Sequence, residues 1–222
     1  MPESIVDEIK AYNARIIASE LSCNFASCPK CGETPECFKL HEVRARAFRV
    51  VRERSVLKLE SFVCRWKCPL CKRTTIDYPP FALPYKRYVK ATVLDFSAKY
   101  VHEDTASYRQ VTRDDGLATF YDSVGLDDID ERQLAPSTIH RWITSLSGLP
   151  RTLRATCQLI REKSSTSDLF RRFLPAPPWK VRSDERGKLL GSCLRLVLAE
   201  IEYRRLFNLS IFPRLATANA WG

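Results

Sequence analysis

The sequence predicts an α+β fold in which a small β zinc ribbon precedes a mainly α-helical region with a helix-turn-helix-like unit. Two Cys-x2-Cys pairs enclose a segment in which apolar and basic residues alternate, as they do in half-exposed strands. Beyond residue 88, apolar residues recur at intervals of three and four, the period of amphipathic helices. This change of period marks where β-structure gives way to helices.

Four cysteines form the most specific motif of the chain. They occur as Cys-Pro-Lys-Cys at residues 28–31 and as Cys-Pro-Leu-Cys at residues 68–71. Two residues between ligands let the backbone turn back on a metal, so two such pairs can supply four thiolates to one tetrahedral Zn²⁺. We therefore predict a closed, structural zinc site with the ligands Cys28, Cys31, Cys68 and Cys71.

Three further cysteines, Cys23, Cys37 and Cys64, lie near these pairs and leave the ligand set open. The spacing between Cys64 and Cys68 is also permissible for zinc ligands. A zinc ribbon takes one pair from each end of a strand pair, and this favours the four ligands named above. A redox function is disfavoured, because neither pair opens a helix in a βαβ context.

The segment between the two pairs predicts a basic hairpin. Residues 43–47 and 57–60 alternate between apolar and charged side chains, which indicates two strands. Arg44 and Arg46 then project from one face, and Arg49 continues the basic run. These arginines are candidate nucleic-acid contacts, because Lys and Arg side chains that neutralise phosphates release counterions.

Positive charge is concentrated in two segments of a chain whose formal net charge is +10. Basic residues outnumber acidic ones by 15 to 6 in residues 27–90 and by 14 to 6 in residues 150–222, whereas residues 91–149 carry 5 basic and 10 acidic residues. This distribution is typical of a protein that meets a polyanion over part of its surface. The alternative is a solvated basic surface that serves solubility.

The composition also excludes several classes. No uncharged run of 18 residues occurs, and Glu3, Asp7 and Glu8 stand where a secretory signal would be basic and then apolar. We expect a cytoplasmic protein with no membrane partner, in a reducing compartment where paired cysteines usually bind metal. With only seven glycines and no Gly-rich phosphate loop or hydrolase triad, we expect no small-molecule substrate.

A proline-rich connector follows the second cysteine pair. Residues 79–88 read Pro-Pro-Phe-Ala-Leu-Pro-Tyr-Lys-Arg-Tyr, and the prolines favour an extended and fairly stiff segment. We expect most of its aromatic residues to pack against the ribbon. Lys86 and Arg87 would remain outside as further nucleic-acid contacts.

The runs at residues 65–75 and 79–88 resemble a bacterial family of zinc-ribbon proteins without assigned function. That family is itself similar to the N-terminal zinc-binding and helix-turn-helix regions of insertion-sequence transposases. The matching motifs extend from Cys28 to about Trp142, and a looser likeness continues to residues 212–214. The cysteine pairs alone are common, whereas their combination with Pro-Tyr-Lys-Arg-Tyr is more specific. The resemblance implies a transposase-like DNA-binding protein and allows a protein partner from a mobile element.

A helix that begins at Pro136 is the candidate recognition helix. Pro136 suits the first helical position, where its missing N–H costs nothing. The apolar residues fall on one face of this helix: Ile139, Trp142, Ile143 and Leu146. The polar candidates for groove contacts precede or alternate with them: Ser137, Thr138, His140 and Arg141. The alternative is an ordinary amphipathic surface helix, because Ala135 is a poor cap and more than twenty residues separate Pro136 from the helix before it.

Five further helices are expected, at residues 3–21, 89–101, around Tyr108, 150–163 and 184–207. The acidic passage at residues 127–131 is interpreted as a solvated loop, with a metal site disfavoured there. We divide the chain into an N-terminal helix (1–26), the ribbon with its connector (27–84), a helix-turn-helix-like segment (85–149) and a C-terminal helical region (150–222).

The sequence therefore favours a DNA-binding protein with structural zinc, a transposase-related accessory or regulatory factor without a catalytic domain. A transposase needs carboxylates that hold two metal ions on a mixed α/β core, and no succession of strands after residue 88 provides one, so we expect no enzyme. The alternative is a protein-protein interaction module that docks a partner through the ribbon and helices. Duplex DNA is the expected partner and Zn²⁺ the expected cofactor.

Overall fold

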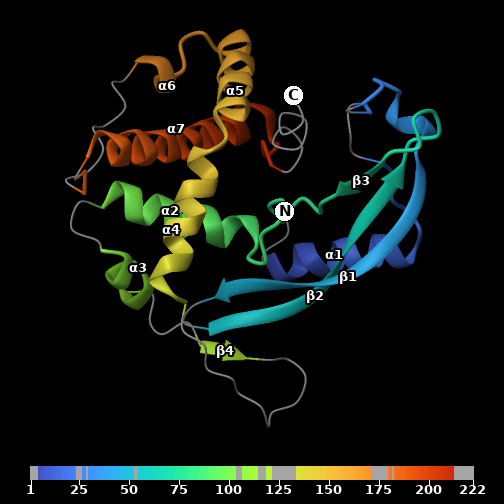
Figure 1. Cartoon of the computed structure of the whole chain (residues 1–222), viewed down its shortest axis with the longest axis horizontal. Coiled ribbons are helices and arrows are strands. Elements are labelled where there is room, and N and C mark those ends of the chain that lie inside the picture. The colour runs from blue at the N-terminus through green and yellow to red at the C-terminus, as the bar shows by residue number, and fades with distance from the viewer. Residues whose placement is uncertain are drawn as a thin grey trace. The chain divides into compact units, whose positions relative to one another are not determined.

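The computed structural model describes residues 5–23, 27–28, 30–52, 55–103, 107–114, 119–121, 134–171, 180–181 and 183–212. It confirms the α+β fold class (Figure 1). The chain divides into two compact units. The first comprises Met1–Val50, Leu57–Lys90 and Phe212–Gly222, and the second comprises Val51–Val56 and Ala91–Ile211. The four-segment division stays a prediction, because a grouping by contacts does not show which segments fold independently.

A long β-hairpin dominates the first unit. β1 (Lys39–Arg52) and β2 (Ser55–Lys67) run in opposite directions, and β3 (Thr74–Asp77) pairs antiparallel with the end of β2 (Figure 1). The register joins Cys64 to Asp77 and Lys67 to Thr74. The sheet order is β1-β2-β3, and β4 (Thr119–Tyr121) also pairs with β2. The alternating segments therefore are strands, and both strands extend well beyond them.

Helix α1 (Ile5–Ile17) packs against this sheet. Its Tyr12 ring meets the edge of Phe81 at 5.5 Å between centroids. Asn13 Nδ2 donates to the Glu60 carbonyl at 3.0 Å and Asn13 Oδ1 accepts from Ser61 Oγ at 2.6 Å. The helix ends at Ile17, which is 78% exposed, whereas Ile16 packs against the core.

The proline-rich connector forms part of the core. Phe81 is fully buried and meets the Phe48 ring edge-on at 5.3 Å, while Tyr88 is buried nearby. Tyr85 remains exposed at the end of the loop, as expected for one aromatic of the set. Lys90 is buried, and its Nζ donates to the Pro80 carbonyl of the connector at 2.7 Å.

The second unit is built around one long helix, α7 (Asp184–Phe207). Its buried residues lie on several sides: Leu190, Cys193, Leu194, Leu196, Val197, Ala199, Glu200 and Tyr203. A helix buried on so much of its circumference is a core helix. One of its apolar residues, Ile201, is nevertheless 58% exposed.

Shorter helices surround α7. They are α2 (Lys90–His102), α3 (Tyr108–Asp114), α4 (Pro136–Ser147), α5 (Pro150–Lys163) and α6 (Asp168–Arg171). Both α4 and α5 pack against α7, and α3 packs against α4. The expected bounds of α5 and α7 are confirmed. The buried residues of α5 are Thr152, Thr156 and Ile160, whereas Leu153 and Cys157 are only partly buried.

The α3–α4 pair bears on the helix-turn-helix expectation. The described cap of α3 is Ser107, whose Oγ accepts from Gln110 N–H while Gln110 Oε1 accepts from Ser107 N–H, a reciprocal capping arrangement. Strand β4 (Thr119–Tyr121) lies between the two helices in sequence. The helix-turn-helix-like unit stays a prediction, because residues 115–135 lie between α3 and α4 where that motif has a tight turn.

A stack of aromatic and basic side chains fixes α3 inside the second unit. The Tyr100 and Tyr108 rings are parallel, with centroids 4.1 Å apart. Arg186 on α7 donates to both hydroxyls, at 2.9 Å to Tyr100. Lys180 Nζ lies 4.0 Å from the Tyr100 ring centroid, a cation–π contact. The stack therefore holds α2, α3 and α7 together.

Within the described residues, no helix is both long enough and apolar enough to cross a membrane. The acidic passage at residues 127–131 lies outside the described residues.

Candidate metal centre and basic pocket

Four cysteines meet at one end of the hairpin. Cys28 Sγ lies 3.5 Å from Cys71 Sγ, Cys31 Sγ lies 3.6 Å from Cys68 Sγ, and all four sulfurs lie within 4.8 Å of one another. Tetrahedral zinc with Zn–S bonds of about 2.3 Å places sulfurs about 3.8 Å apart. The cluster could therefore hold a metal ion, and among the described residues these four cysteines make the group suited to one.

The neighbouring cysteines have other surroundings. Cys64 Sγ lies 3.9 Å from the Tyr12 hydroxyl, in the core beneath α1. Cys37 Sγ lies 3.6 Å from Thr34 Oγ1 and is exposed. Cys23 is half-buried and packs beside the cluster without belonging to it. The alternative ligands considered from the sequence are therefore outside the group of four.

Both cysteine pairs adopt the same backbone turn. The N–H of Cys28 donates to the Glu33 carbonyl at 2.8 Å, and the N–H of Gly32 donates to the Cys28 carbonyl at 2.9 Å. In the second pair, Cys68 N–H donates to Arg73 O at 2.9 Å and Lys72 N–H to Cys68 O at 3.1 Å.

The residue after each pair has a positive φ, +74° at Gly32 and 60° at Lys72. Glycine adopts this conformation without strain, whereas Lys72 carries its Cβ there at a cost. The repeated hydrogen bonds and the repeated φ show that the two pairs are built alike, each with its cysteines turned toward the cluster.

The strand register places the second pair. β2 ends at Lys67 and β3 begins at Thr74, so Cys68 and Cys71 occupy the turn that joins two paired strands. Cys28 and Cys68 are buried in an apolar cluster with Phe38 and Trp66. This packing covers one side of the sulfurs, as in sites that serve structure.

Backbone amides favour ionisation of one thiol. Burial acts against the charged form of Cys28, but the N–H groups of Lys30 and Cys31 and the neighbouring thiols lower its pKa to about 7 overall. A thiol with a lowered pKa is readily converted to the thiolate that binds metal.

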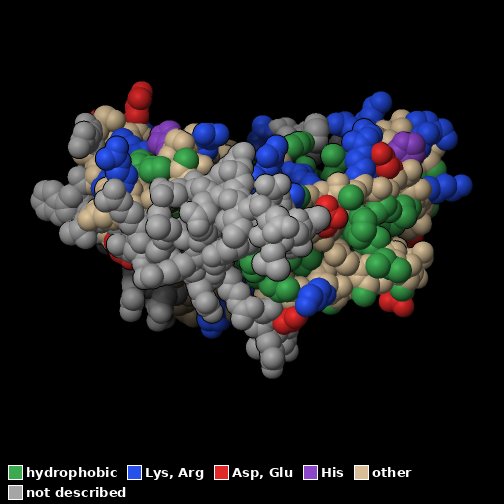
Figure 2. All heavy atoms as spheres, turned by 90° about the horizontal axis from the view of Figure 1, so that it is seen from below, with side chains coloured by type: hydrophobic (Ala, Val, Ile, Leu, Met, Phe, Trp, Pro, Cys, Tyr) green, Lys and Arg blue, Asp and Glu red, His purple; other side chains and the backbone are tan. Residues whose placement is uncertain are grey.

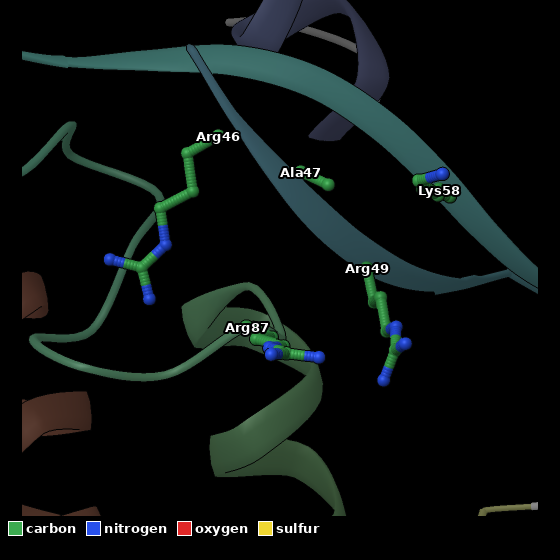
Figure 3. A pocket seen from close by; sticks show the side chains of 5 residues that line it. All are labelled: Arg46, Ala47, Arg49, Lys58 and Arg87. Carbon is green, nitrogen blue, oxygen red and sulfur yellow. The ribbon is translucent and has the colours of Figure 1, made fainter. Parts of the chain in front are cut away.

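A basic pocket of about 580 Å³ lies on the same unit (Figure 3). Arg46, Ala47 and Arg49 line it from β1, Lys58 from β2 and Arg87 from the connector. Figure 3 shows the three guanidinium groups around one open space, with Lys58 on the neighbouring strand. Lys and Arg side chains are also prominent on the surface in Figure 2.

Main-chain pairing positions the arginines of this pocket. Arg49 N–H donates to the Arg87 carbonyl at 2.8 Å, and Val89 N–H donates to the Arg49 carbonyl at 3.0 Å. The connector thus forms a parallel bridge with β1 at Arg49 and Tyr88. This bridge brings Arg87 beside Arg49 although the two are far apart in sequence.

Neutral groups orient the guanidinium of Arg46. Its Nη2 donates to the Lys86 carbonyl at 3.1 Å, and its Cζ lies 5.6 Å from the Phe48 ring and 5.7 Å from the Tyr78 ring. Arg49 lies similarly 5.7 Å from the Tyr88 ring. For Arg46, a carbonyl and two aromatic faces hold the cation in place without cancelling its charge.

The remaining residues of the predicted basic face are arranged differently. Arg44 is exposed, and its Nε pairs with Glu42 Oε1 at 2.5 Å, so a carboxylate balances its charge. Lys86 is not among the residues that line the pocket, although its carbonyl accepts a hydrogen bond from Arg46. Lys58 was not predicted, although its position in the alternating segment at 57–60 could have indicated it.

The candidate residues on α4 lie in the second unit. Ser137, His140 and Arg141 are exposed and Thr138 is half-buried, whereas the four apolar residues are buried as expected. Arg141 Nη2 donates to Ser137 Oγ at 3.4 Å, and His140 meets the Tyr108 ring edge-on at 5.9 Å between centroids. Ala135 provides no side-chain cap, as expected. The four candidates therefore share one helix but do not belong to the basic pocket.

No protein-family model matches the chain, and the searches of curated proteins and of solved structures found no match either. The fold and the cluster define an α+β protein with four cysteines that could hold a metal ion.

Proposed function

We propose that this chain is a DNA-binding protein with a structural Zn²⁺, acting as a transposase-related accessory or regulatory factor without a catalytic domain. The observation that carries the proposal is the basic pocket on the hairpin. Arg46, Arg49, Lys58 and Arg87 surround a space of about 580 Å³, which concentrates positive charge where a backbone phosphate can enter. Arginine suits this task, because its planar guanidinium can donate two parallel hydrogen bonds to a phosphate.

Zinc is the metal that fits the cluster best. Four thiolates form the soft, tetrahedral ligand set typical of structural zinc sites. Here Cys28 and Cys31 would bind it from the segment before β1, and Cys68 and Cys71 from the β2–β3 turn. The ion would thereby join the segment before β1 to the β2–β3 turn, in the same sheet whose strands line the basic pocket. Its binding free energy would contribute to folding.

The α4 face has a different task in this proposal. Its exposed Ser137, His140 and Arg141 are short or basic side chains suited to contacts with groove edges or phosphates. The pocket would supply binding that is independent of sequence, and α4 would supply any discrimination between sequences.

The test measures duplex binding by fluorescence anisotropy across a salt series. It compares the zinc-loaded full chain with the variant Arg46→Gln/Arg49→Gln/Arg87→Gln. Loss of up to three phosphate contacts should make the plot of log affinity against log salt shallower by about 2 to 3. The control variant Lys10→Gln/Arg15→Gln/Arg204→Gln removes the same charge from exposed positions outside the pocket. Equal binding by the pocket variant and the control variant would contradict the proposal.

Single-stranded DNA and structured RNA belong in the same series. Preference for duplex DNA supports the proposal, whereas preference for RNA would show that the pocket binds RNA and not DNA. If the wild-type chain binds none of the three at low salt, the interaction-module alternative takes its place, with the basic pocket as the site for an acidic protein.

A further inference from the structure

We propose that the outward face of α5 is a second phosphate-binding surface, formed by Arg151, Arg154 and Arg161. This inference rests on the proposed function, because it assigns the α5 arginine face, as these three residues are called below, to the same nucleic acid. It adds a site in the second unit, on a different helix from the α4 candidates.

Packing fixes which side of α5 faces outward. Thr152, Thr156 and Ile160 are buried, and α7 is the described helix against which α5 packs. These residues recur every four positions, so they form one side of the helix. Arg151, Arg154 and Arg161 are exposed and recur at intervals of three and seven, which places them together on the opposite side.

The charge of this face is largely uncompensated within α5. Gln158 also lies on this face. Its Nε2 donates a hydrogen bond at 2.9 Å to Glu162, the sole acidic residue of α5. Within the part of the chain that the structure describes, no ion pair involves Arg151, Arg154 or Arg161. The Arg161 guanidinium lies 4.9 Å from the Phe170 ring centroid, an orienting contact that leaves its charge in place.

A neighbouring helix adds to the positive potential. Burial raises the pKa of Cys157, while Arg161 and the exposed Arg195 of α7 act in the opposite direction on the same thiol. Arg195 therefore lies close enough to α5 to reinforce the field around its arginine face. Arg161 of α5 and Arg195 of α7 thus both lie near Cys157.

The side chains of the α5 arginine face indicate which class of partner it binds. A helix that inserts into a membrane surface, or that forms the core of a protein interface, presents apolar or aromatic side chains. The outward face of α5 presents arginine and glutamine, with the one glutamate Glu162, instead. Arg151 and Arg161 are separated by about 15 Å along the helix axis, a length over which each strand of duplex DNA carries about four phosphates. Nucleic-acid backbone is therefore the partner that these side chains fit.

The test compares three variants of the zinc-loaded full chain in duplex binding across a salt series. They are Arg151→Gln/Arg154→Gln/Arg161→Gln, the pocket variant described above, and Arg151→Lys/Arg154→Lys/Arg161→Lys, which keeps the charges. We expect the glutamine variant of α5 to bind at least tenfold more weakly than wild type near 0.1 M salt, with a slope shallower by about 2 to 3. The lysine variant should keep most of the affinity and the wild-type slope.

The outcomes separate the two proposals. If the α5 glutamine variant binds as wild type does while the pocket variant is weakened, the α5 proposal is overturned and the proposed function stands. If the α5 variant is weakened and the pocket variant is not, the α5 face is supported and the pocket is not the main site. If the α5 glutamine variant has an altered circular dichroism spectrum or melting temperature, the single variant Arg154→Gln takes its place. This variant should make the slope of log affinity against log salt shallower by about 1.

Discussion

Cys28 and Cys71 are 43 residues apart in sequence, yet their sulfurs lie 3.5 Å apart. The whole β1–β2 hairpin lies between them in sequence, so this contact closes the hairpin into one loop. Closing a loop of this length costs conformational entropy unless a bond at its ends compensates. A metal ion at the four sulfurs is a group that can do so.

The first prediction concerns one ligand of the cluster. Cys68→Ser removes a fully buried sulfur from the group of four, so the variant should lose its single bound zinc and much of the ordered structure of residues 28–75. Structural zinc contributes about 10 kcal/mol or more in isolated zinc-binding peptides, so the loss should be large. Elemental analysis measures the loss of zinc, and thermal unfolding measures the loss of stability. Cys157→Ser, outside the cluster, is the control, and zinc retained in Cys68→Ser would refute the ligand set.

The second prediction uses thiol reactivity. Burial raises the pKa of Cys193 to about 12, so this thiol stays protonated and protected in the folded chain at pH 8. Since its folded pKa is above the ordinary value near 9, its stabilising contribution is present below that value and declines as the pH rises toward 12. Iodoacetamide should label the exposed Cys37 first and Cys193 only after unfolding. Peptide mass mapping reads the order, and early labelling of Cys193 would contradict its burial.

The third prediction concerns Glu202. Two hydrogen bonds from Arg205, at 2.7 and 2.8 Å, oppose the effect of burial and, with Ser167, lower the pKa of this carboxyl to about 2. A lowered pKa means that the stabilisation is present above the ordinary value near 4.5 and is lost as the pH falls toward 2. Glu202→Gln should therefore cost about 1 kcal/mol at pH 7, because Arg205 is exposed to solvent.

Chemical unfolding of wild type and Glu202→Gln between pH 2 and 7 measures this cost. The difference between the two free energies of unfolding should shrink below about pH 4.5 and vanish near pH 2. A difference that does not change with pH would show that Glu202 acts through packing alone.

The fourth prediction concerns the buried Glu200. Its carboxylate accepts from Ser210 Oγ at 2.6 Å and from the Ile211 N–H at 2.8 Å, which holds the segment after α7 against the helix. Glu200→Ala leaves a buried N–H without this acceptor and should destabilise the chain by about 2–4 kcal/mol. Glu200→Gln keeps one acceptor oxygen and should cost less. Equal free energies of unfolding for the two variants would contradict the role of the carboxylate.

Local chemistry made much of the architecture predictable. The spacing within the two cysteine pairs identified the cluster, and Pro150 and Asp184 marked the starts of α5 and α7. These features depend on residues close together in sequence, where turn and helix rules apply. The same rules could not place Lys90 or Glu200 inside, because their burial depends on partners ten or more residues away.

The basic pocket shows the limit more clearly. Arg46 and Arg49 could be predicted as outward-facing residues of a basic strand. Their meeting with Arg87 depends on the parallel bridge between β1 and the connector, which no local pattern encodes. Arg44 belongs to the same alternating segment, but the neighbouring Glu42 balances its charge. Tertiary pairing, more than strand periodicity, therefore selects which arginines gather.

The central claim is that a metal-closed hairpin presents a pocket for nucleic-acid phosphates, and duplex affinity before and after zinc removal tests it most directly. The protein is titrated against a fluorescent duplex when loaded with zinc, after chelation and dialysis, and again after zinc is restored. The account predicts at least tenfold weaker binding without zinc and full recovery with it, because the four cysteines hold the sheet that carries Arg46, Arg49 and Arg87. Equal affinity in all three states would contradict it.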